Sequence, residues 1–197
     1  MPFQNINNLN EIKKHLKHIV LYMEKTKDLE SACRFVVPCC FLEYLAKLYY
    51  GRILPNDNKA NDKSIYLKFV NEIFIETNPK YKTFEYDNRE IKLGDQMYLI
   101  LRCGIVHAFS LTPNRRRNTV GKLRSIILAD KNDELEHLAN FSNEFVEDSC
   151  IFKLEEFIND LDKSLDSLFH KAESDMTIAK NITDWTDDYP FIGALTY

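Results

Sequence analysis

The chain is poor in the residues that interrupt regular structure: its 197 residues include only five glycines and six prolines. A loop-rich β protein needs many tight turns, so this scarcity argues against that class. Leucine, isoleucine, lysine and glutamate, most of which favour helices, are frequent. We therefore expect a mainly helical, all-α fold, in a chain long enough for one domain with its own apolar core.

An excess of positive charge, a disulfide pattern and a long apolar run are also absent. The formal net charge is −4, so nucleic-acid binding requires a local basic patch. The five cysteines form no C-x-x-C pair or zinc-type cluster, which predicts a reducing compartment, no metal and no cofactor. The longest apolar run, Phe35–Leu42, is far shorter than a membrane span of ~20 residues. The first twenty residues lack the core of a signal peptide. We expect a cytoplasmic protein with no membrane contact.

Apolar residues recur at helical spacing in five segments. The predicted helices cover residues 8–26, 28–50, 62–77, 95–109 and 150–172. Pro38 lies inside the second segment and predicts either a kink or two shorter helices. Asp62 is the expected N-cap of the third helix, and Gly51 the residue just beyond the second.

Short β segments are expected between these helices. Residues 81–93 alternate around an Asp-Asn turn, which predicts a β-hairpin, and 123–130 predict a strand with a candidate partner in 135–141. The predicted architecture is an up-and-down bundle of four to five helices with a small β-hairpin excursion. Residues 1–172 form the helical domain, and 173–197 are an acidic, aromatic tail that either docks on it or stays mobile.

The segment Leu99–Leu111 is almost continuously apolar but contains Arg102 and His107. A helix that is apolar on all sides is normally buried, and a buried arginine must be paired. In an ideal α-helix five positions rotate by roughly 140° and rise about 7.5 Å, so the two side chains do not stack. The helix must loosen near His107, or a second copy must complete a shared site. Tyr98 lies on the side of Arg102, and Gly104 permits close approach or local distortion.

Two interpretations of this pair stay open at this point. In one, Arg102 pairs inside the core with Glu43 or with an acid of the last helix, and His107 is a hydrogen-bonded core residue. In the other, both side chains line a functional cleft, where guanidinium binds phosphate and imidazole transfers a proton. His137 and His170 stand alone in the sequence and carry no functional signal.

The sequence Arg102-Cys-Gly-Ile-Val-His107 resembles the R-x(4–6)-H signature of the HEPN superfamily. The setting is also similar, because the motif lies late in a central helix of a small bundle and an amphipathic helix follows it. The resemblance implies a HEPN-like homodimer in which two motif helices face each other across one cleft. It also implies metal-independent endoribonuclease activity, in which the ribose 2′-OH attacks the adjacent phosphate.

The resemblance extends to cellular role and to partners. It implies a toxin, phage-defence or RNA-processing context, with RNA as substrate and an antitoxin or defence-complex protein as partner. Arg102 and His107 are then the catalytic residues, supported by Tyr98, Cys103 and Gly104. Many active members have a polar residue where this chain has Cys103, so a non-catalytic module that binds RNA, nucleotide or protein is the alternative.

A basic segment follows the motif. Five positive residues fall within ten positions without an intervening acid; they are Arg115, Arg116, Arg117, Lys122 and Arg124. Next to the motif of an acidic chain, they are candidates for steering an RNA backbone. The alternative is a loop whose charges are simply solvated.

Overall fold

The computed structural model describes residues 8–25, 31–51, 61–81, 85–86, 89–90, 93–105, 111–112, 124–142 and 149–189. The α-helices in these ranges are α1 (Leu9–Met23), α2 (Ser31–Tyr50), α3 (Asp62–Glu72), α4 (Leu93–Gln96), α5 (Leu154–Ser174) and α6 (Met176–Asp188). The other helical turns are η1 (Phe74–Thr77), η2 (Pro79–Tyr81) and the π-helix η3 (Met97–Arg102). The strands are β1 (Glu85–Tyr86), β2 (Arg89–Glu90), β3 (Ser125–Ala129), β4 (Asn140–Phe141) and β5 (Ser149–Lys153).

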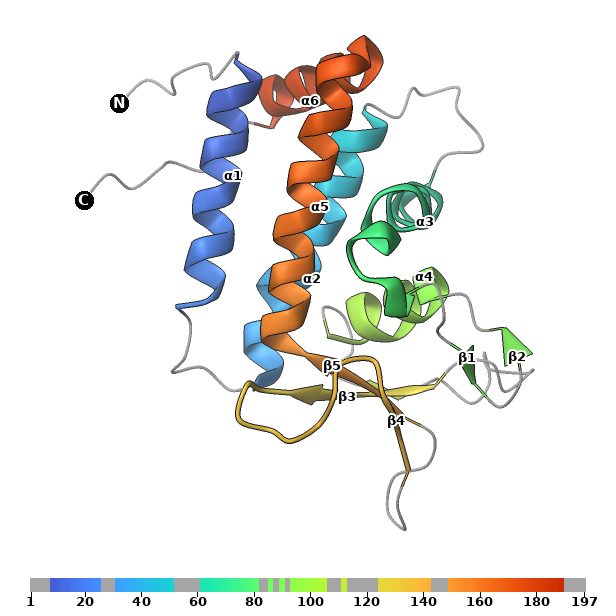
Figure 1. The fold of residues 1–197 in the computed structure, drawn as a ribbon. Helices are drawn as coiled ribbons and strands as arrows, with labels where there is room; N and C mark the ends of the chain where they lie inside the picture. The colour runs from blue at the N-terminus through green and yellow to red at the C-terminus, as the bar shows by residue number, and fades with distance from the viewer. Residues whose placement is uncertain are drawn as a thin grey trace.

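Helices dominate the arrangement, which confirms the mainly helical prediction. Figure 1 shows α1, α2 and α5 lying lengthwise, with α1 running toward the sheet and α2 and α5 running away from it. The small sheet lies at the end of the bundle where α5 begins, and α6 crosses the other end. The antiparallel pair β1–β2, with Tyr86 opposite Arg89, confirms the predicted hairpin.

The apolar core lies between α1, α2, α3 and α5. Helix α1 buries its spaced residues Ile12, Leu16, Val20 and Met23, as an amphipathic helix does. At the sheet end the ring of Phe157 packs on Phe35, Phe74 and Phe152, with centroids about 6 Å apart. Burying each such ring contributes roughly 2 kcal/mol to folding, so this cluster fixes α5 against α2 and the sheet.

The helix ends follow local chemistry, with one correction. The N-cap of α3 is Asn61 rather than Asp62, because Asn61 and Ser64 form a reciprocal capping box. Gly51 follows α2 as predicted, and its φ of +83° is one that glycine adopts without strain. Helix α2 is continuous through Pro38, so two shorter helices do not form. The predicted cap of that helix, Asp28, lies outside the described residues.

The three-stranded sheet goes beyond the predicted hairpin and corrects the start of the last helix. β5 lies between β3 and β4, parallel to β3 and antiparallel to β4. Residues 150–153, which the sequence assigned to a helix, belong to β5, and α5 begins at Leu154. Because β5 is buried on both faces, its sequence has no alternation that could distinguish it from a buried helix. The predicted strand at 123–130 is confirmed as β3, but the segment 135–141 contributes β4 to β5 instead.

The segment after residue 172 includes a packed helix. Ile178 and Ile182 of α6 join the core, and Asn181 donates to the carbonyls of Tyr49 and Tyr50 at 3.1 and 3.0 Å. Residues 176–188 are therefore docked on the end of α2, which is one of the two outcomes the sequence left open. Among the described helices, none combines the length and the apolar character needed to cross a membrane.

Candidate functional site

The helix that carries Arg102 is wound differently from the expected α-helix. Residues 97–102 form the π-helix η3, and the backbone N–H of Cys103 bonds to the carbonyl of Tyr98, five residues earlier. In this winding the hydrogen bonds join positions i and i+5, so each turn holds more residues than a turn of an α-helix. The angle between positions 102 and 107 that was calculated for an ideal α-helix therefore does not apply to a π-wound segment. π turns are rare in proteins, and those that occur are often found at functional sites.

Arg102 lies in an ion pair between η3 and α2. Its Nε and Nη2 donate to the same oxygen, Oε2 of Glu43, at 2.8 and 2.6 Å. The side chains of both residues are about 15% exposed. Nη1 points to the Sγ of Cys103 at 3.7 Å, and the guanidinium lies 5.6 Å from the centre of the Tyr98 ring. Glu43 is the partner that the first interpretation named.

This pairing keeps both groups charged. Burial alone would raise the pKa of Glu43, but the hydrogen bond and the charge of Arg102 outweigh it and lower that pKa. Burial would likewise lower the pKa of Arg102, and the contacts with Glu43 and Cys103 raise it instead. The site thus holds a guanidinium in one fixed orientation, which is the group that recognises phosphate by two parallel hydrogen bonds.

Glu43 connects Arg102 to the far end of the bundle. The Nζ of Lys47, one turn along α2, lies 3.3 Å from Oε1 of Glu43 and 6.0 Å from the centre of the Trp185 ring of α6. Each carboxylate oxygen of Glu43 therefore contacts a different cation. If Arg102 bound another anion, Glu43 would keep its contact with Lys47.

One face of α2 beside this pair presents apolar side chains to the exterior. Cys33, Val37 and Cys40 are exposed and recur at helical spacing, with Val37 at 49%. The pKa of the Cys40 thiol is raised first by burial and then by the charge of Glu43, while Arg102 opposes the shift, which places Cys40 near the ion pair. Leu99 of η3 is a further exposed apolar side chain, at 37%.

Only part of the predicted site lies within the described residues. Of the predicted supporting residues, Tyr98 and Cys103 contact Arg102, and Gly104 follows them in the same helix; Tyr98 also packs edge-on against Tyr66 at 5.2 Å. Five predicted site residues lie outside the described residues: His107, Arg115, Arg116, Arg117 and Lys122.

Arg124 corrects the prediction of an RNA-binding side chain. It is 2% exposed, and its Nη2 donates to the carbonyl of Ser149 in β5 at 2.6 Å. Gln96 fixes its backbone, since the side-chain oxygen of Gln96 accepts from the Arg124 N–H at 2.9 Å and its Nε2 donates to the Arg124 carbonyl at 2.5 Å. Arg124 therefore ties β3 to β5 and to the start of η3, and cannot steer an RNA backbone at the surface.

Described residues on either side of positions 113–123 are joined by a backbone hydrogen bond. The backbone N–H of Ile126 donates to the carbonyl of Leu111 at 2.8 Å, beside the contact between Gln96 and Arg124. The chain therefore returns to η3 after residue 123.

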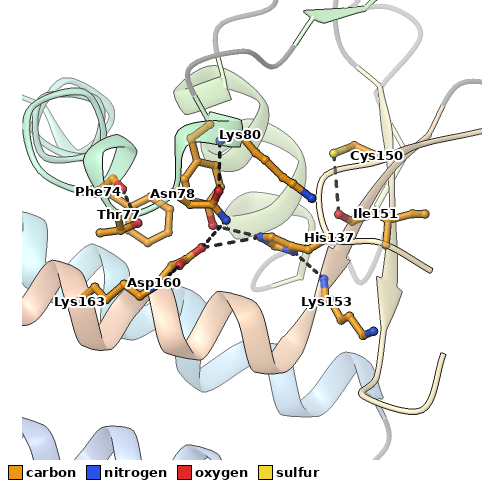
Figure 2. Close-up of polar contacts among 11 residues, drawn as sticks. Phe74, Thr77, Asn78, Lys80, His137, Cys150, Ile151, Lys153, Asp160 and Lys163 are labelled. Carbon is orange, nitrogen blue, oxygen red and sulfur yellow. Dashed lines mark hydrogen bonds and ion pairs between the residues drawn. The ribbon is translucent and has the colours of Figure 1, made fainter. Parts of the chain in front are cut away.

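Sequence reasoning missed a buried polar cluster around His137. Nδ1 of His137 accepts from the backbone N–H of Lys153 at 2.9 Å, and Nε2 lies 3.2 Å from the Tyr81 hydroxyl. Figure 2 shows the ring between Lys153 on one side and Asp160 on the other, with Asn78 beside the carboxylate. The cluster combines residues near positions 80, 137 and 155, which are far apart in the chain. No spacing within the sequence therefore indicates this cluster.

No group of three or more His, Cys, Asp and Glu residues suited to a metal ion occurs within the described ranges. No family model, no curated protein and no solved structure matches the chain. The case for its function thus stands on the geometry around Arg102 and on the motif itself.

Proposed function

We propose that the chain is a HEPN-like, metal-independent endoribonuclease that acts as a homodimer. The observation that carries the proposal is the fixed guanidinium of Arg102, held by Glu43 in a π-wound helix directly before position 107. The motif supplies a histidine five positions later, which is the distance in sequence that one hydrogen bond of a π-helix spans.

In the proposed reaction, the ribose 2′-oxygen attacks the adjacent phosphorus. The bond from phosphorus to the 5′-oxygen breaks, leaving a 2′,3′-cyclic phosphate and a 5′-hydroxyl. The imidazole of His107 takes the 2′-proton or supplies the proton that the leaving oxygen needs. The guanidinium of Arg102 offsets the charge on the phosphoryl oxygens in the transition state.

The surroundings of Arg102 fit such a substrate in two ways. Because Glu43 also contacts Lys47, it retains a cation when phosphate competes for Arg102. The basic run Arg115 to Arg117 begins three residues after Thr112 in the sequence, and we propose that its charges steer the RNA backbone.

The proposed dimer uses the exposed apolar face of α2. Cys33, Val37 and Cys40 lie on it, beside the ion pair, so a second copy on this face would bring two Arg102 side chains toward one cleft. Val37→Asp tests this surface, because a charge at its centre weakens an apolar interface. We expect a concentration-dependent dimer for the native chain and a monomer for this variant in sedimentation. A native monomer at all concentrations contradicts the dimer.

Cleavage is tested by incubating the chain with total RNA in EDTA. We expect 2′,3′-cyclic phosphate ends from the native chain and none from His107→Ala, while the dimer persists. His170→Ala is the matched control, since His170 is 86% exposed on α5 and outside the site. Full cleavage by His107→Ala overturns the assignment.

A non-catalytic HEPN-like module is the second candidate, and the Glu43 contact favours it. Both Nε and Nη2 of Arg102 are directed at a carboxylate, as in an ion pair that serves folding. In that case the RNA stays intact at high protein concentration, and Arg102→Ala changes the stability of the chain without affecting any RNA. An antitoxin or defence-complex protein is then the proposed partner of the cleft.

A further inference from the structure

The imidazole of His137 joins three parts of the fold. It comes from the turn before β4 and contacts the hydroxyl of Tyr81 in η2 at 3.2 Å. It also accepts the backbone N–H of Lys153, where β5 becomes α5, at 2.9 Å. A second acceptor, Oδ2 of Asp160 on α5, lies 4.0 Å from Nε2. The side chains of His137 and Asp160 are 3% and 2% exposed. Water therefore cannot replace the protein contacts of the ring.

The contacts fix the tautomer of the neutral ring. Nδ1 faces a backbone N–H, which only donates, so Nδ1 must carry the lone pair and Nε2 the proton. The Nε2–H then donates to the oxygen of Tyr81. The Tyr81 hydroxyl in turn bonds to Asp160, which together with burial and the charge of that carboxylate raises the pKa of Tyr81. In this chain of hydrogen bonds the imidazole therefore donates to the Tyr81 hydroxyl, and the hydroxyl donates to the Asp160 carboxylate.

The backbone next to the ring is held in place. Leu138 has φ +63°, a region that a leucine occupies at a cost of about 1 kcal/mol. Its N–H donates to the carbonyl of Ile151 at 2.7 Å, and the N–H of Ile151 donates to Ala139 at 3.1 Å. Because β5 fixes this turn on both sides, a change at the imidazole is accommodated by rotation of the ring.

We propose that His137 is a proton-dependent latch between the sheet and α5. The neutral ring holds the Lys153 N–H, and the protonated ring releases it and turns to Asp160. A proton on Nδ1 would oppose a second donor at 2.9 Å, so the Lys153 contact cannot survive protonation. The imidazolium instead gains the carboxylate that lies 4.0 Å away. Release frees the first backbone N–H of the β5–α5 junction, the point at which α5 leaves the sheet.

The charges around the ring determine when the latch opens. The charged and titratable groups that face it, or lie beside those that do, are Glu136, Lys80, Tyr81, Lys153, Asp160 and Lys163. Burial first, and then the positive charges of Lys80 and Lys153, lower the pKa of His137 to about 4. Asp160 favours the charged ring, but Lys163 at 3.2 Å and Asn78 at 3.3 Å already satisfy part of its charge. The latch is therefore closed at neutral pH and opens in acid.

Nuclear magnetic resonance on the full ¹⁵N-labelled chain tests the latch from pH 7 to 3.5. We expect the His137 ring to titrate well below the ordinary value, and the exchange protection of the Lys153 amide to fall about tenfold in the same step. His137→Asn keeps an oxygen acceptor at the position of Nδ1 but cannot titrate, so it should hold Lys153 protection constant. His170→Asn, at an exposed histidine, should behave as the native chain does.

Three results would overturn the latch. One is constant Lys153 protection while His137 titrates, and another is an equal loss of protection in His137→Asn. The third is simultaneous loss of protection at all core amides, which would mean global unfolding. The His137 titration and the Lys153 protection are both measured on the unmodified chain. They therefore decide the question even if His137→Asn does not fold. No reading uses RNA, so failure here is distinct from failure of the proposed nuclease.

Discussion

Removing the ion pair of Arg102 should cost stability in a way that reveals direct coupling. Glu43 accepts two charge-assisted hydrogen bonds at 2.8 and 2.6 Å, and both side chains are only about 15% exposed. Hydrogen bonds to charged groups contribute roughly 1.5–3 kcal/mol, and loss of one partner leaves the other partly buried and unpaired. We expect Glu43→Ala and Arg102→Ala each to lower the free energy of unfolding by about 2–3 kcal/mol.

The double variant separates the pair from its surroundings. In urea denaturation, Glu43→Ala with Arg102→Ala should cost about 2 kcal/mol less than the sum of the single changes. The matched control is the pair Lys13 and Asp166 at 2.9 Å, whose side chains are 34% and 52% exposed. Its coupling should stay below about 1 kcal/mol, because solvent screens exposed pairs. A coupling between Glu43 and Arg102 as small as the control would refute the account of the site.

Three further predictions concern the framework of the fold. His137 stays neutral down to about pH 4, whereas an unfolded histidine takes up a proton near pH 6.5. The free energy of unfolding should therefore fall by about 3 kcal/mol as the pH drops from 6.5 to 4. Urea midpoints of the native chain and of His137→Asn measure this change. Gln96→Leu leaves the buried N–H and carbonyl of Arg124 without their side-chain partners and should cost about 2–3 kcal/mol; a loss under about 0.5 kcal/mol would count against this contact. Gly51→Ala should destabilise the chain by about 1 kcal/mol or more, because φ is +83° and the added methyl meets Asn181, and an unchanged melting temperature would contradict this.

The sequence predicts the helical segments well because their patterning is local. The apolar spacing of Ile12, Leu16 and Val20 identifies α1, and the turn chemistry between Tyr86 and Arg89 identifies the hairpin. It fails at β5, where Cys150 and Leu154 continue a four-residue spacing across a strand boundary. A strand buried on both faces is recognised by its neighbours, and those are distant in the sequence.

The site shows the same limit. Glu43 could be named as a partner of Arg102, because a buried guanidinium requires an acid and few acids lie in apolar helices. The π winding could not be predicted, because no residue pattern distinguishes it from an α-helix in an apolar run. Arg124 illustrates the reverse error: its charge suggested a surface role, but the Ser149 carbonyl and Gln96 hold it inside. Tertiary contacts, rather than local sequence, decide which arginine is buried.

The most direct test of the proposed function is RNA cleavage in EDTA by the native chain and by His107→Ala, compared at equal concentration and equal folded fraction. The account predicts RNA fragments with 2′,3′-cyclic phosphate ends from the native chain alone. Intact RNA with the native chain, or undiminished cleavage with His107→Ala, would contradict it.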